Sequence, residues 1–69
     1  MKLERIGLVG VGVTHLLTTH GGRRLGVVSH LDGRRELAIY DPEEPDRAVG
    51  AVALKPVEAR AVADVLDAE

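Results

Sequence analysis

The segment from Val13 to Asp41 constrains the fold most, because β-rich runs alternate in it with glycine-containing turn sequences. Gly21-Gly22 and Asp32-Gly33 each separate two runs rich in Val, Leu, Ile and Thr. Such dipeptides are typical of two-residue type I′ hairpin loops, whose central residues both need positive φ. The segment therefore predicts three antiparallel strands joined by two tight turns.

Two-residue loops fix which side chains share a face of the sheet, since directly paired residues point to the same side. Counting back from the turns places Leu17 opposite Gly26 and Val28 opposite Leu37. His15 and His30 then share a face. One predicted face carries Val13, His15, Leu17, Gly26, Val28, Leu37 and Ile39, and the other carries Leu16, Leu25, Val27, Ala38 and Tyr40.

The flanking segments complete an α+β pattern. Lys2 to Leu8 alternates weakly, and Ala48 to Leu54 is a short apolar run. Pro56 to Asp67 predicts a helix, with proline at its first position and one apolar stripe at i, i+3, i+4 spacing. We predict a small, mainly antiparallel sheet of four to five strands with one C-terminal helix. That stripe covers one sheet face only, so the other face needs a partner.

Size and composition make a partner still more necessary. The chain has 69 residues, no cysteine, one tyrosine and neither Phe nor Trp. A single domain of this size buries only about 60% of its unfolded surface, and disulfides are excluded as a supplement. Oligomerisation or a neighbouring domain is the supplement left open.

Charge and hydropathy exclude several classes of partner. The net charge is −2, without the basic field that phosphate binding needs, and stacking aromatics are missing. These features disfavour the alternative interpretation, a small β-rich nucleic-acid or peptide-binding module. No apolar run is long enough to span a membrane and no signal peptide is evident, so we expect a cytoplasmic domain without direct membrane insertion.

No constellation of catalytic or cofactor-binding residues is visible. The glycines from Gly7 to Gly12 match neither a dinucleotide fingerprint nor a Walker A loop, and a strand-like run follows them. Ser29 and His30 are neighbours on a strand and point to opposite faces, so they form no dyad. His15 and His30 lack a third metal ligand because His20 lies at a distant turn, and the acidic loop Glu43–Asp46 lacks EF-hand spacing. We predict no enzyme activity, no metal and no cofactor.

The run Val27–Leu37, followed by Tyr40-Asp41-Pro42, resembles the N-terminal domain of bacterial potassium/proton antiporter regulatory subunits of the KhtT type. Leu8–Gly12 is similar to the family's Leu-Pro-Gly-x-Gly entry, and Asp41–Asp46 to its acidic segment. Ala51–Leu54 with Glu58-Ala59-Arg60 is similar to its last strand and helix. Two positions depart from the pattern: Val9 replaces a proline, and Lys55-Pro56 replaces a threonine N-cap.

The resemblance implies a single regulatory-subunit domain over residues 1–69, either free-standing or a fragment of a chain that continues into a TrkA-C domain. Its implied function is to form homo-oligomers and to relay the regulator's state to a membrane-embedded antiporter, at which it would be peripheral. Nucleic acid is not an implied partner. As interface residues we predict Val27, His30, Arg34, Arg35 and Tyr40.

Overall fold

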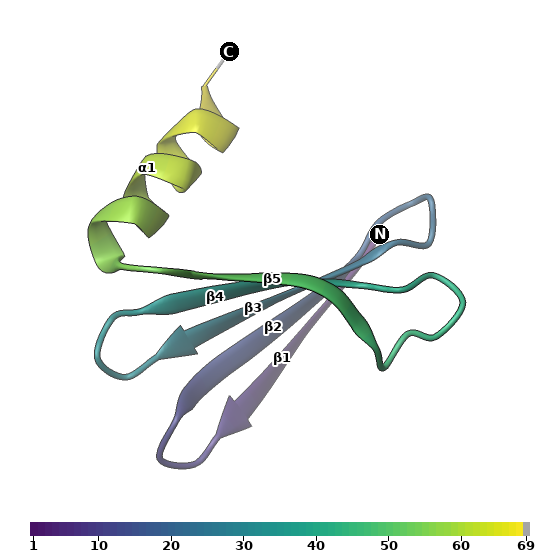
Figure 1. The fold of residues 1–69 in the computed structure, drawn as a ribbon, viewed down its shortest axis with the longest axis horizontal. Helices are drawn as coiled ribbons and strands as arrows, with labels where there is room; N and C mark the ends of the chain where they lie inside the picture. The colour runs from purple at the N-terminus through teal and green to yellow at the C-terminus, as the bar shows by residue number, and fades with distance from the viewer. Residues whose placement is uncertain (69) are drawn as a thin grey trace.

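The computed structural model describes residues 1–68, which form one five-stranded antiparallel sheet followed by a helix (Figure 1). The strands are β1 (Lys2–Leu8), β2 (Gly12–Thr18), β3 (Arg24–His30), β4 (Arg35–Tyr40) and β5 (Ala48–Leu54), and the helix is α1 (Pro56–Asp67). The strands lie in the sheet in their order along the chain. The predicted fold class is therefore confirmed: consecutive hairpins build a meander, and α1 leaves the edge strand β5.

The two central hairpins close with three-residue loops, so the predicted two-residue loops are wrong. The backbone N–H of Thr19 donates to the carbonyl of Arg23 at 2.8 Å, and that of His30 to Arg34 at 2.9 Å. Gly22 and Gly33 have φ of 80° and 94°, and no non-glycine residue in the described chain has positive φ. A type I turn followed by one left-handed glycine gives this loop, whereas a type I′ turn needs two such residues.

The longer loops shift the register by one residue, which overturns the predicted distribution of side chains between the two faces. Leu17 pairs with Leu25 instead of Gly26, and Val27 pairs with Leu37. His15 pairs with Val27, whereas His30 pairs with Gly12, so the two histidines lie on opposite faces. A shift of one residue exchanges the faces of a whole strand, because side chains alternate along it.

The corrected register concentrates the aliphatic side chains on one face. We call this side the aliphatic face; it carries Leu3, Arg5, Val13, His15, Leu17, Leu25, Val27, Ser29, Arg35, Leu37, Ile39, Val52 and Leu54, with Gly7 and Gly50. The opposite side is called the mixed face; it carries Lys2, Glu4, Ile6, Leu8, Thr14, Leu16, Thr18, Arg24, Val28, His30, Glu36, Ala38, Tyr40, Ala48, Ala51 and Ala53, with Gly12 and Gly26.

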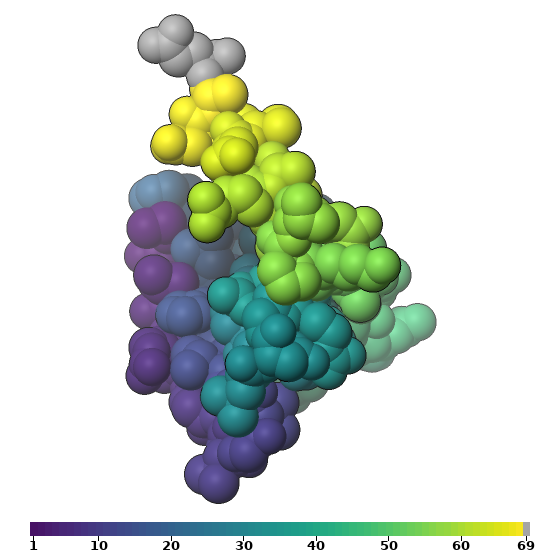
Figure 2. Space-filling model, turned by 90° about the vertical axis from the view of Figure 1, so that its left-hand side faces the viewer, coloured from purple at the N-terminus to yellow at the C-terminus, as the bar shows by residue number. Residues whose placement is uncertain are grey.

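Helix α1 begins where the sequence predicts it, at Pro56. A lysine side chain has no acceptor with which to cap the first turn, but the Lys55 backbone N–H donates to the Glu58 carboxylate at 2.8 Å. The helix rises from the end of β5 and stands away from most of the sheet (Figures 1 and 2). None of its residues is buried, so α1 covers the aliphatic face only in part.

A closed hydrophobic core is absent from the described residues: no aliphatic or aromatic side chain among them is fully buried. The accessible surface is 5285 Å² for a 7.4-kDa chain. Folded monomers of this mass expose about 4,200 Å². The excess of about 1,100 Å² exceeds the roughly 800 Å² that each partner contributes to a standard protein interface.

Candidate functional site

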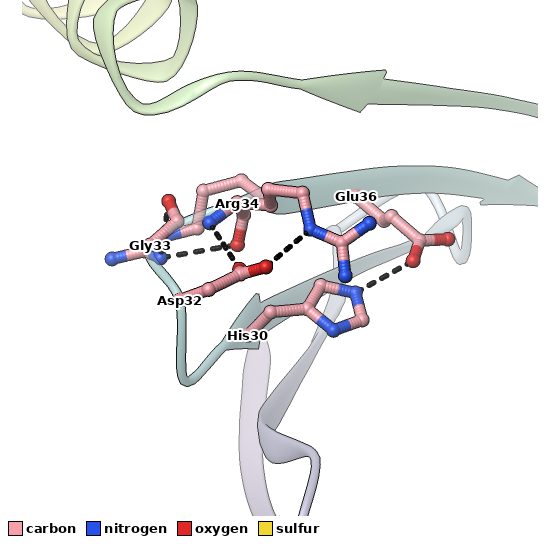
Figure 3. A network of polar contacts seen from close by, with 6 residues as sticks. His30, Asp32, Gly33, Arg34 and Glu36 are labelled. Carbon is pink, nitrogen blue, oxygen red and sulfur yellow. Dashed lines mark hydrogen bonds and ion pairs between the residues drawn. The ribbon is translucent and has the colours of Figure 1, made fainter.

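The β3–β4 hairpin, which carries all five predicted interface residues, is held by a His30–Glu36 hydrogen bond and an Arg34–Asp32 ion pair (Figure 3). His30 Nε2 lies 2.6 Å from Glu36 Oε1, across the two strands on the mixed face. In the loop, Arg34 Nε donates to Asp32 Oδ2 at 2.8 Å. Both pairs are local and partly exposed, so they fix the shape of this hairpin and do not anchor it to the rest of the fold.

Asp32 is the residue of this hairpin whose ionisation is tied to the loop. Its carboxylate accepts the Arg34 backbone N–H at 3.0 Å in addition to the guanidinium bond. These donors stabilise the charged form and lower the pKa of Asp32 from its ordinary 3.8, the backbone hydrogen bond being the largest cause. The loop therefore presents Asp32 as a carboxylate that is already paired with Arg34.

Arg35 points to the other side of the hairpin. Its Nη1 donates to the carbonyls of Gly33 at 3.0 Å and Arg34 at 3.2 Å. The side chain also lines a groove of roughly 220 Å³ between α1 and the aliphatic face. Other lining residues are Val27, Leu37, Leu54, Ala59, Val62, Ala63 and Leu66. Arg35 thus ties the loop carbonyls to the base of the groove.

Tyr40 packs across the mixed face onto β3, where Gly26 leaves room for it. A Cβ atom built on Gly26 would lie 3.0 Å from Tyr40 Cε2 and 3.5 Å from Leu16 Cδ2. The Arg24 guanidinium lies 5.8 Å from the centre of the Tyr40 ring, within the range of a cation–π contact. Gly26 is accordingly the one buried residue in the described chain, and the ring of Tyr40 covers its backbone.

The five predicted interface residues do not lie on one surface. Val27 and Arg35 belong to the aliphatic face, His30 and Tyr40 belong to the mixed face, and Arg34 lies in the exposed loop between them. Any partner that touches all five would have to wrap around the hairpin. They are therefore better divided between two contact surfaces.

The larger candidate surface is the open part of the aliphatic face, which the predicted register did not reveal. Leu3 is 62% exposed, and Ile39 and Val52 are each 50% exposed. Together with the half-buried Leu17 and Leu25 they form an uncovered aliphatic area beside the α1 groove. Counting the turns as three-residue loops would have placed Leu17 and Leu25 together from sequence.

Among residues 1–68, no three His, Asp or Glu side chains come together as candidate metal ligands. No helix in the same part of the chain has the length and apolar character needed to cross a bilayer. The polar groups that converge, at the β3–β4 loop, are already bonded to one another.

Comparison with known proteins supports a family assignment. The whole chain, residues 1–69, matches the family described as "K(+)/H(+) antiporter subunit KhtT, N-terminal domain". The chain belongs to this family. The resemblance drawn from Val27–Leu37 and its flanking segments is thereby confirmed.

Two proteins of Bacillus subtilis (strain 168) are similar to the chain. One is named "K(+)/H(+) antiporter subunit KhtT" and the other "Uncharacterized protein YrvC". Each is 29% identical over 66 residues, which is 96% of this chain and 40% of the relative. The chain thus spans about two fifths of the length of these relatives.

Proposed function

We propose that this chain is a non-catalytic regulatory domain of a cation/proton antiporter subunit, acting in the cytoplasm at the membrane-embedded transporter. The observation that carries the proposal is the match of all 69 residues to the KhtT N-terminal family. The name of one relative, an antiporter subunit, supplies the kind of partner. Potassium is the cation that this name suggests.

The proposal assigns the domain two contacts, one for assembly and one for coupling. The open part of the aliphatic face supports assembly with a second copy, because an isolated chain leaves Leu3, Ile39 and Val52 exposed. Val27 and Arg35 line the adjoining α1 groove and are assigned to the edge of this contact. The mixed face and the β3–β4 loop, with His30, Arg34 and Tyr40, are assigned to the antiporter. These residues are polar or amphipathic, as contacts that form and release usually are.

The test is antiporter activity in proteoliposomes. An antiporter encoded with this chain is reconstituted, and potassium-driven proton flux is measured with and without added chain. The proposal expects the chain to bind the vesicles only when the antiporter is present and to change the flux. Equal flux and no antiporter-dependent binding would overturn the coupling role.

Two matched arginine variants locate the coupling surface. Arg34 lies in the β3–β4 loop and Arg23 in the β2–β3 loop, at the opposite end of the sheet. Arg34→Ala should weaken binding to the antiporter vesicles severalfold, whereas Arg23→Ala should leave it unchanged. Equal effects of the two variants would remove the β3–β4 loop from the coupling surface.

A further inference from the structure

The ionisable residues of the aliphatic face are all of the basic type. They are Arg5, His15 and Arg35, and no carboxylate lies on this face among the described strands. Arg5 and His15 are a direct cross-strand pair in the part of the face that α1 leaves open. In the described chain, neither forms an ion pair with a carboxylate. An acidic group on an element that covers this area would therefore find a basic partner in Arg5.

Helix α1 carries such a group next to a second apolar stripe. Ala59, Val62, Ala63 and Leu66 line the groove toward its own sheet. Val57, Ala61 and Val65 follow one another at i, i+4, i+8 on another side of the helix, where Val57 is 73% and Val65 is 74% exposed. Asp64 flanks this outer stripe at 100° per residue. The outer stripe of α1 is therefore aliphatic, with Asp64 beside it and Arg60 about 40° beyond Asp64 on the same side.

The outer stripe cannot contact the sheet of its own chain, because the opposite side of α1 faces that sheet. Figure 2 shows α1 rising away from β1 and β2, with a hollow between its end and those strands. A second copy can supply the same helix to the open area. We infer that two copies associate about a two-fold axis, each placing the outer stripe of α1 on the β1–β3 half of the partner's aliphatic face.

In this arrangement, Asp64 of each copy meets Arg5 and His15 of the other. The whole chain exposes about 1,100 Å² more than a compact monomer of its mass. A standard interface buries roughly 800 Å² per partner, so a contact of that size would bring the exposure of the chain close to the ordinary value. Two-fold symmetry makes the contact occur twice, so each substitution acts at both places. This inference rests on the assembly role in the proposed function, and it identifies the residues through which the two copies contact each other.

A charge exchange tests the pairing in the full chain, with the dissociation constant of the dimer measured by sedimentation equilibrium. Arg5→Glu and Asp64→Arg should each raise the dissociation constant about tenfold, because each brings like charges together. The double variant restores opposite charges and should return to within about threefold of the wild type. Circular dichroism checks that each variant keeps its sheet.

Matched controls and an independent variant keep the result unambiguous. Arg23→Glu and Asp46→Arg make the same charge changes in exposed loops and should leave the dissociation constant unchanged. Val65→Asp introduces a charge into the outer stripe and should abolish the dimer without changing the circular dichroism spectrum. This exposed position carries no internal packing that the substitution would disrupt.

The outcomes separate this interface from the proposed function. A dimer that ignores both charge reversals, or a double variant no tighter than either single variant, overturns the α1 interface while assembly stands. A wild-type chain that stays monomeric at all concentrations overturns the interface and the assembly role together. The proteoliposome assay is independent of either result, because it measures coupling to the antiporter.

Discussion

Val9 occupies the position of the β1–β2 turn at which a proline fits best. The Val11 backbone N–H donates to the Leu8 carbonyl at 3.0 Å, and Gly10, the third residue of the turn, has φ of 76°. These features are typical of a type II turn, in which proline is common at the second residue. Val9 is fully exposed and donates no backbone hydrogen bond in the described chain.

Val9→Pro should therefore raise the free energy of unfolding by about 0.4–1 kcal/mol, because it restricts the unfolded chain without removing a bond. Urea denaturation at one fixed protein concentration measures the change. Gly10→Ala is the control and should lower stability by about 1 kcal/mol or more, since it forces a side chain into the left-handed region. A destabilising Val9→Pro would show that the turn is of another type.

Asp32 gives the hairpin loop a defined dependence on pH. Its pKa is lowered in the fold by the Arg34 backbone N–H, and then by the Arg34 side chain. A lowered folded pKa means that the stabilisation is complete well above 3.8 and is lost as the pH falls through the folded value. Denaturation of the wild type and of Asp32→Asn at a series of pH values should show that the difference in their free energies of unfolding decreases as the pH falls. A stability difference that stays constant with pH would show that the ionised Asp32 side chain does not stabilise the loop.

At the scale of elements, the sequence predicts the strands and the helix well, but it does not fix the register. Proline at the first position determines the start of α1, and the β-rich runs identify the strands. Asp32-Gly33 is compatible with a two-residue loop and with the observed three-residue loop. The choice depends on whether Asp32 adopts positive φ. Asp32 does not, because its carboxylate bonds to Arg34 from the more common conformation.

The one-residue shift in strand pairing determines which parts of the site can be predicted from the sequence. Shifting β3 by one residue places Leu25 and Val27 on the aliphatic face, where the predicted register had placed Gly26 and Val28. In the corrected register, Arg5 and His15 form a cross-strand pair on a face that carries no carboxylate among the described strands. Residue types in the sequence therefore indicate that a partner surface exists, while its position depends on loop geometry.

Helix α1 should be the least stable element of the isolated chain. None of its residues is buried, and its last turn contains no basic residue to complement the helix dipole. In dilute solution its amide hydrogens should exchange faster than those of β3, which is paired on both sides. Asp67→Lys should slow exchange in α1 by adding about 0.3–1 kcal/mol at the helix C-terminus. Hydrogen exchange with mass spectrometry measures the exchange rates of the wild type and of Asp67→Lys. Equal protection of α1 and β3 in the wild type would contradict the prediction that α1 is the least stable element.

At the scale of the whole molecule, surface area sets the expected behaviour. The chain exposes 5285 Å² and buries no aliphatic side chain fully among the described residues, so little hydrophobic stabilisation is available to a monomer. A partner that binds only the folded state stabilises it by mass action. The surface left open by α1 therefore links folding to association.

The thermal midpoint of the wild-type chain should consequently rise with protein concentration, measured by circular dichroism over a hundredfold range. Val65→Asp should show a lower midpoint that does not change with concentration, because the variant unfolds as a monomer. Val49→Asp changes another exposed valine, on β5, and should keep the wild-type dependence of the midpoint on concentration. If the wild-type midpoint is the same at every concentration, the exposed aliphatic face does not drive self-association, and its occupant must be a different protein.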